Sequence, residues 1–182
     1  MKAFVVEKYG KDGLRAAAVP EPMVGRREVL VRVSAASINP LDKMTRNGEF
    51  KRLIKRRPPF ALGHDMAGVV TEVGADVRDF KVGDEVYARP RDLRIGTFAE
   101  YIAIDQDDVA PKPDALTLKE AAAVPLVALA AWQILVDRTP AAGSEGARPR
   151  RSRRPRLNGH PACQAPRRRR RDHHRHGHCR PG

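Results

Sequence analysis

The sequence of 182 residues predicts a mainly β fold, a small closed or partly open barrel with short helices at its C-terminal end. Three observations support this prediction. Short runs rich in valine, isoleucine and aromatic residues are separated by turn residues over the first 110 positions. Within several of these runs, successive side chains fall on two different faces, as the wall of a barrel requires. After Pro113 the composition shifts to alanine and leucine, and a helix-start signal follows.

Five runs are expected to form strands, and glycine, proline and asparagine turns lie between them. The expected strands are Ala3–Val6, Val29–Val33, Gly68–Val73, Glu85–Tyr87 and Phe98–Ile104. The expected turns are Pro20–Pro22, Asn47–Gly48, Gly74–Asp76 and Gly83–Asp84. Many short strands separated by such turns are typical of a small closed or partly open barrel.

The segment after Pro113 is expected to be helical. Thr117-Leu118-Lys119-Glu120 fits a capping box, in which the hydroxyl and the carboxylate each bind a free backbone N–H. The alanine-rich run that follows is interrupted at Pro125 and resumes from 126 to 137, with Trp132 on an apolar face. The apolar stretch is shorter than the roughly 20 residues of a membrane-spanning helix, so we expect a buried helical element and no membrane partner.

Charge divides the chain at residue 137. Residues 1–137 carry 21 basic and 20 acidic side chains, whereas residues 138–182 carry 14 arginines, no lysine and two acids. The basic character therefore belongs to the last quarter and excludes a basic nucleic-acid-binding domain in the body. After Val136 the only large aliphatic residue is Leu157. Such a segment buries too little apolar area to offset chain entropy, so we expect residues 138–182 to be disordered.

Both cysteines, Cys163 and Cys179, lie in this last segment. The body therefore has neither a disulfide framework nor a thiolate metal site. The apolar run at the N-terminus is too short for a signal peptide, which favours a cytoplasmic location.

Three segments, in this order and spacing, resemble the medium-chain dehydrogenase/reductase superfamily in its zinc-independent quinone oxidoreductase branch. They are residues 35–42; residues 63–70 with 73–74 and 80–86; and residues 96–101 with 121–126 and 131–133. The resemblance implies a GroES-like N-terminal catalytic domain over 1–115 and a helical connection over 116–137. A Rossmann domain that binds the cofactor would follow this connection. It also implies that later strands of the same protein complete the barrel.

The resemblance implies hydride transfer from NADPH to a quinone or a conjugated carbonyl (enone). The protein would contribute positioning and hydrogen bonds. Asn39 would face the nicotinamide or the substrate, although an Asx turn before Pro40 is the alternative. Relatives often carry a threonine that contacts the nicotinamide ribose or amide where this chain has Ala131, so both positions are candidate cofactor-binding residues. NADPH is the usual cofactor of the family and a homodimer its usual assembly.

The resemblance also implies the absence of zinc. Zinc relatives carry a cysteine where this chain has Asn39, and zinc catalysis needs about three protein ligands. His64 would then stand alone as a candidate ligand, so we expect it to hold the turn before a buried strand. Asp42, which caps the same loop in many relatives, is expected to be structural.

The glycine turn that binds the pyrophosphate should begin soon after Asp137, but Gly143-Ser144-Glu145-Gly146 and an Arg/Pro/His run follow instead. Back-translation of residues 152–174 with a shift of one nucleotide can give an A-G-G-P-G turn and an A-I-Q-L-A-K helix. We therefore hypothesise a frameshift between Asp137 and Glu145, and we expect the chain as written to be inactive.

Two other functions of residues 138–182 remain open. The arginine run could bind nucleic acid or an anionic surface unspecifically, because no aromatic side chain is present to stack on bases. The second possibility is metal binding by the histidines and cysteines 160, 163, 173, 174, 176, 178 and 179. Within the body, the basic residues Arg46, Lys51, Arg52, Lys55, Arg56 and Arg57 are expected to form a solvated face or to guide an anionic substrate.

Overall fold

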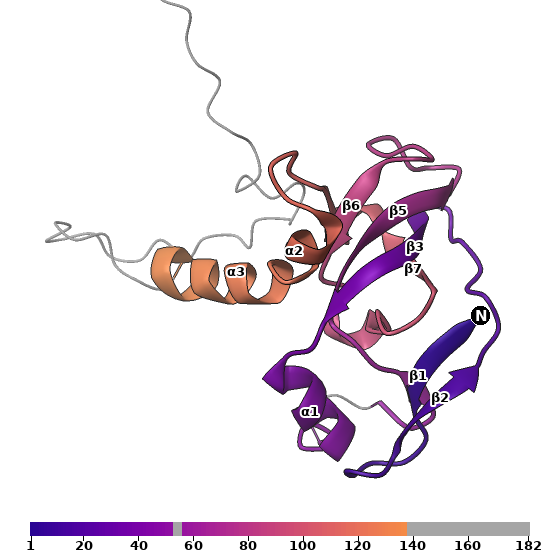
Figure 1. Cartoon of the computed structure of the whole chain (residues 1–182), viewed down its shortest axis with the longest axis vertical. Helices are drawn as coiled ribbons and strands as arrows, with labels where there is room; N and C mark the ends of the chain where they lie inside the picture. The colour runs from indigo at the N-terminus through magenta and orange to yellow at the C-terminus, as the bar shows by residue number, and fades with distance from the viewer. Residues whose placement is uncertain (53–55, 138–182) are drawn as a thin grey trace, which may run out of the picture.

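The computed structural model describes residues 1–52 and 56–137, which form two antiparallel sheets and several short helices (Figure 1). The smaller sheet has the order β2-β1-β4, with β1 at Lys2–Val6, β2 at Leu14–Ala18 and β4 at Phe60–Ala61. The larger sheet has the order β7-β3-β5-β6-β8, with β3 at Glu28–Ser37, β5 at Asp65–Val73, β6 at Glu85–Ala88, β7 at Tyr101–Asp105 and β8 at Val109–Pro111. This sheet curls into a half-barrel, which confirms the predicted mainly β, partly open fold. The predictions for residues 138–182 lie outside the described residues.

All five predicted strands are present, but one begins later than expected. The strand predicted at Phe98–Ile104 starts at Tyr101, because the preceding residues connect the two sheets instead. Phe4 N donates to Phe98 O at 2.8 Å, and Glu100 N donates to Lys2 O at 3.1 Å. The sequence did not predict β2, β4 and β8, which are alanine-rich or only two to three residues long.

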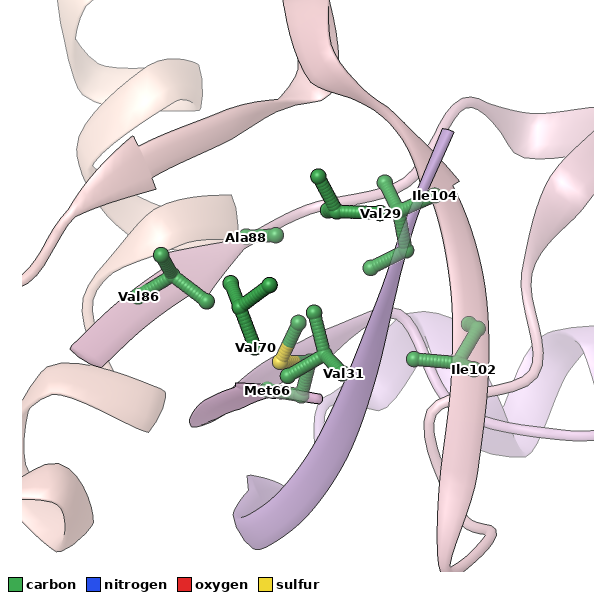
Figure 2. Packing of buried hydrophobic residues seen from close by; sticks show 8 residues of the cluster. All are labelled: Val29, Val31, Met66, Val70, Val86, Ala88, Ile102 and Ile104. Carbon is green, nitrogen blue, oxygen red and sulfur yellow. The ribbon is translucent and has the colours of Figure 1, made fainter. Parts of the chain in front are cut away.

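The main core lies on one face of the larger sheet (Figure 2). Alternate side chains of the central strands point into it, as the period of two requires. The buried members are Val29, Val31, Met66, Val70, Val86, Ala88, Ile102 and Ile104. Burying each large aliphatic side chain contributes about 1.5–3 kcal/mol, so this cluster is the principal stabilising contact of the domain.

A helix that the sequence did not predict follows β3. Helix α1 spans Pro40–Asn47, with Asn39 as its N-cap and a proline at its first position, where a missing N–H costs nothing. The residue after the helix is Gly48, with φ of 81°. The predicted Asn47–Gly48 turn is therefore the C-terminal cap of a helix, because glycine adopts this left-handed conformation without strain.

Helices α2 (Leu118–Ala122) and α3 (Pro125–Trp132) follow β8, and a π-helical turn, η3, spans Gln133–Asp137. The predicted capping box is confirmed, since Glu120 N donates to Thr117 Oγ1 at 3.3 Å and Thr117 N donates to Glu120 Oε2 at 2.8 Å. In α2, the side chains of Ala121 and Ala122 are buried and pack with Ala67 of β5.

The prediction of a buried helical element is wrong from α3 onward. Within α3 only Pro125 is buried, whereas Val127 and Trp132 are 59% and 45% exposed, and Leu135 in η3 is 69% exposed. The physical reason is visible in Figure 1, where α3 begins next to β5 and then extends away from the half-barrel. No helix among residues 1–52 and 56–137 is both long and apolar enough to cross a membrane.

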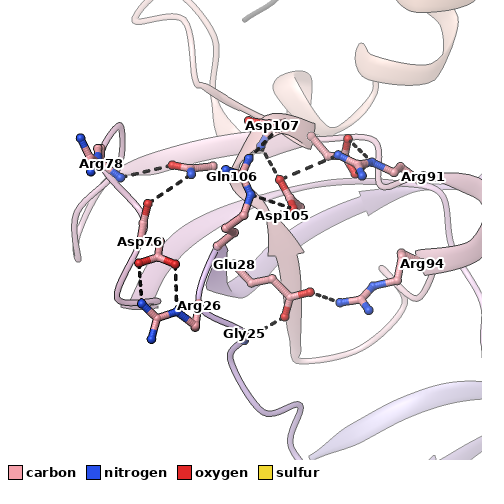
Figure 3. Close-up of polar contacts among 12 residues, drawn as sticks. Gly25, Arg26, Glu28, Asp76, Arg78, Arg91, Arg94, Asp105, Gln106 and Asp107 are labelled. Carbon is pink, nitrogen blue, oxygen red and sulfur yellow. Dashed lines mark hydrogen bonds and ion pairs between the residues drawn. The ribbon is translucent and has the colours of Figure 1, made fainter. Parts of the chain in front are cut away.

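Polar contacts hold the loops at one end of the larger sheet (Figure 3). The guanidinium of Arg26 donates to both carboxylate oxygens of Asp76, at 2.9 and 2.8 Å. Gln106, in the 3-10 turn η2 at Gln106–Asp108, accepts from Arg78 N at 3.2 Å. Arg94, in the 3-10 turn η1 at Asp92–Arg94, pairs with Glu28. Exposed pairs of this kind contribute about 0–1 kcal/mol each, so they fix the loops more than they stabilise the domain.

Candidate functional site

Asn39 lies at the end of β3, where the chain turns into α1, and it is only 8% exposed. Its side-chain nitrogen donates to Asp65 Oδ2 at 2.9 Å and to Ser37 Oγ at 3.2 Å. Its backbone N donates to Asp42 Oδ2 at 2.7 Å, which fixes the first turn of α1. The side chain is therefore tied to both β3 and β5, and the backbone begins the helix.

Asp65, the first residue of β5, is fully buried and accepts hydrogen bonds from three segments. Besides Asn39, Ser37 Oγ donates to Oδ2 at 3.0 Å, and Leu126 N donates to Oδ1 at 3.1 Å. Burial raises the pKa of Asp65, the bonds from Asn39, Ser37 and Leu126 oppose that rise, and the nearby charge of Asp42 adds to it. The carboxylate is therefore the junction of β3, β5 and the start of α3.

His64 and Asp42 form a second buried polar pair beside this junction. His64 Nδ1 lies 2.7 Å from Asp42 Oδ1, and both side chains are almost completely buried. Asp42 thus holds Asn39 N with one carboxylate oxygen and His64 with the other. This arrangement supports the structural roles that the sequence suggested for both residues.

The second predicted cofactor residue, Ala131, lies in the last turn of α3 and is exposed. Within the described ranges no hydrogen bond joins Ala131 to Asn39. The two are connected only indirectly, because the start of α3 is bound to Asp65 through Leu126. The structure therefore brings Asn39 together with Asp65, which also binds the start of the helix that carries Ala131.

An apolar groove of about 610 Å³ lies between the two sheets, and Ile38, the residue before Asn39, lines it, whereas Asn39 does not. The second half of β3 borders it, because β7 pairs with β3 only along Glu28–Arg32. Thr97, fully buried, lines the groove, and its hydroxyl has no hydrogen-bond partner within residues 1–52 and 56–137. The neighbouring side chain of Ile38 is 84% exposed. The groove is therefore an accessible apolar surface of the half-barrel.

The predicted basic face is only partly a solvated face. Lys51, Arg52 and Arg57 are exposed, but Arg56 is half-buried, with its guanidinium 5.2 Å from the centre of the Phe60 ring. Desolvation by this burial lowers the pKa of Arg56. Lys55 lies outside the described residues. Among the residues that the structure does describe, no group of three or more His, Cys, Asp or Glu side chains could hold a metal ion.

Sequence reasoning missed the contributions of Ser37 and Asp65. The available signal was a carboxylate at the start of the strongly apolar run Met66–Val70, since a charged residue is rarely fully buried unless it is paired. The partners themselves could not be predicted, because they come from positions 26 to 61 residues away in the sequence.

Comparisons with known proteins agree with this architecture. Residues 25–114 match the family described as the alcohol dehydrogenase GroES-like domain. The mitochondrial NAD(P)H oxidoreductase RTN4IP1 of Bos taurus is 39% identical over 150 residues, which cover 74% of this chain and 38% of that protein. The chloroplastic NADPH-dependent alkenal/one oxidoreductase of Arabidopsis thaliana is 38% identical over 134 residues, which cover 69% of this chain and 34% of that protein.

Among solved structures, the Escherichia coli quinone oxidoreductase in complex with NADPH superimposes with a TM-score of 0.67 and 27% identity, covering 75% of this chain and 40% of that one. The half-barrel is thus a GroES-like domain of the alcohol dehydrogenase type. The chain belongs to the medium-chain dehydrogenase/reductase superfamily and is similar to its quinone and alkenal oxidoreductases. It spans less than half of the length of these curated relatives.

Proposed function

We propose that residues 1–137 are the N-terminal catalytic portion of an NADPH-dependent, zinc-independent oxidoreductase that reduces quinones or enones by hydride transfer. Residues 1–115 would be the catalytic domain and residues 116–137 the helical connection to a cofactor-binding domain. The observation that carries the proposal is the buried, doubly hydrogen-bonded Asn39 at the β3–α1 junction, where zinc relatives place a cysteine. An amide cannot replace a thiolate as a zinc ligand, which favours metal-free chemistry.

The described residues fit part of a nicotinamide cofactor. The Asn39 amide has a polar group to offer to the nicotinamide or its ribose. When bound, NADPH would supply the hydride, and the chain's own contribution would be to hold and orient it. The glycine turn needed for the pyrophosphate does not occur within residues 1–137.

Two exposed apolar surfaces support a larger assembly of domains. Helix α3 and η3 expose Val127, Trp132, Ile134, Leu135 and Val136, although a helix that is apolar on all sides is normally buried. Beyond Arg32, no strand within residues 1–52 and 56–137 pairs with the groove edge of β3. We propose that a cofactor domain covers α3 and that later strands of the full-length enzyme fill the groove.

The first experiment is to resequence the gene across codons 130–182 and downstream. A single-base correction that restores an A-G-G-x-G turn after Asp137 would support the proposed frameshift. We then expect the frame-restored protein to oxidise NADPH in the presence of a quinone or an enone, and the chain as written to leave NADPH unchanged. NADPH turnover by the chain as written would contradict the proposed inactivity.

The frame-restored protein also allows a test of Asn39. Asn39→Ala should lower kcat/KM by about tenfold or more, because one hydrogen bond to a ligand is lost. Ser34→Ala is the matched control, since Ser34 is exposed on the same strand and forms no part of the polar junction. Equal activity of Asn39→Ala and Ser34→Ala would contradict the proposed role of Asn39.

A further inference from the structure

We infer that Asp65 is a positioning residue that decides which atom of the Asn39 amide faces a ligand. Asp65 and Ser37 bind the NH2 group of Asn39, so only the oxygen Oδ1, which also faces the backbone N–H of Asp42 in a capping box, can accept from a cofactor. This inference rests on the proposed function, because it assigns Asn39 a ligand.

The hydrogen bonds at the junction determine the orientation of the amide. An asparagine NH2 group has two N–H donors, and both have partners here, namely Asp65 Oδ2 at 2.9 Å and Ser37 Oγ at 3.2 Å. An ionised carboxylate only accepts hydrogen bonds, so Asp65 cannot be paired with the oxygen of the amide. Reversing the amide would place two acceptors against each other at a fully buried position, which is costly.

This orientation restricts what Asn39 can do chemically. Its oxygen can bind an N–H or an O–H group, such as the carboxamide of the nicotinamide or a hydroxyl of its ribose. It cannot donate to an oxyanion that develops on a quinone or enone substrate, because no N–H of the side chain is left. Asn39 therefore holds the cofactor, and stabilisation of the substrate oxyanion must come from another group.

Asp65 also couples this orientation to α3. Its second oxygen, Oδ1, accepts from Leu126 N, one of the N–H groups that have no partner within their own helix at a helix start. The same carboxylate thus fixes both the Asn39 amide and the first turn of the helix that leads away from the half-barrel. An amide at position 65 cannot serve both, since it offers one acceptor oxygen and one NH2 group.

Asp65→Asn should therefore invert the amide of Asn39. If the oxygen of the new side chain stays on Leu126 N, its NH2 group faces Asn39, which must turn its own oxygen inward. The test is solvent exchange of the Asn39 side-chain NH2 protons, measured by NMR on the 15N-labelled full chain and assigned with Asn39→Asp. We expect slow exchange in the unaltered protein and faster exchange, by about tenfold or more, in Asp65→Asn. Asp65→Glu keeps the carboxylate and should retain slow exchange.

Ser37→Ala and Ser34→Ala provide a second comparison if Asp65→Asn does not fold. Ser37→Ala should speed up exchange of one Asn39 proton and leave the other, bound to Asp65, protected. Ser34→Ala should change neither proton. Unchanged exchange in a folded Asp65→Asn variant, or equal loss of protection for both protons in Ser37→Ala, would overturn the inference.

Binding of reduced nicotinamide mononucleotide tests the ligand side of the inference. This probe carries the nicotinamide and its ribose but no adenosine. Asn39→Ala and Asp65→Asn should each weaken its binding by about tenfold, and the double variant should be no weaker than either, because Asp65 acts through Asn39. If the double variant weakened binding of the probe by about hundredfold, the product of the two single effects, the inference would be overturned. If the probe does not bind the unaltered chain, the proposed cofactor role fails, and the exchange measurements decide the orientation on their own.

Discussion

The polar junction around Asp65 and the apolar helix α3 share one hydrogen bond, from Leu126 N to Asp65 Oδ1. They differ in how many of their side chains have partners within the described chain. At the junction, the buried side chains of Asn39, Asp42, His64 and Asp65 all have partners at 2.7–3.2 Å. Six residues after Leu126, the side chain of Trp132 is 45% exposed. The polar junction is therefore satisfied by residues of the described chain, whereas α3 leaves apolar side chains exposed to water.

The largest difference between these regions should appear in stability. Met66→Ala removes a fully buried side chain from the main core and should cost about 2–5 kcal/mol of unfolding free energy. Leu135→Ala removes an aliphatic side chain that is 69% exposed, and it should change stability by about 0.5 kcal/mol or less. Urea unfolding followed by circular dichroism measures both. Similar losses of stability in the two variants would show that η3, the turn that follows α3, is packed in solution. The two regions would then not differ in stability.

A smaller effect is expected from the buried pair beside the junction. His64→Ala leaves Asp42 Oδ1 without its 2.7 Å partner in a site that water does not reach, and it should cost about 1–3 kcal/mol. The same urea experiment in an Asp42→Ala background provides the control. In that background the additional cost of His64→Ala should shrink, because the partner is already absent. Equal costs in both backgrounds would show that the pair contributes nothing to stability.

The smallest effect is expected at the start of α2. Thr117→Ala removes the hydroxyl that accepts from Glu120 N and should cost about 1 kcal/mol. The pH dependence should also change. Hydrogen bonds from the backbone and the hydroxyl of Thr117 lower the pKa of Glu120, so this contribution to stability is present above the ordinary carboxyl pKa and is lost as the pH falls through the lowered value.

Urea unfolding at a series of acidic pH values tests this sign. In Thr117→Ala the acid-dependent loss should be smaller but not absent, because the backbone N–H of residue 117 still donates to Glu120 Oε2. An acid-dependent loss as large as in the unaltered chain would contradict a role for the hydroxyl.

The sequence predicted the fold where local pattern and tertiary packing agree. The alternation in Val29–Val33 correctly indicated a strand with two different faces, and in the structure Val29 and Val31 lie in the core. The capping box at Thr117 correctly placed the start of α2. Helix α1 was missed because Asn39-Pro40 fits a turn as well as it fits a helix start. The exposure of α3 could not be predicted, because apolar composition does not reveal whether a partner is present.

The site was predictable only in part. Asn39 was a candidate because of its place in a recognisable motif, and the structure places it at a buried polar junction. Its role in the cofactor site and that of Ala131 remain predictions. The contribution of Asp65 depends on Ser37, Asn39 and Leu126 meeting in space, and no local pattern encodes contacts over 61 residues.

The exposure of Trp132 has a practical consequence. It is the single tryptophan of the chain, and it lies on the helix that the proposed cofactor domain would cover. Indole fluorescence shifts to shorter wavelength when the ring leaves water. The emission of this one residue should therefore report directly, without any label, whether α3 is bare or covered in a given preparation. The fluorescence of Trp132 therefore reports on the surface where the two proposed domains would meet.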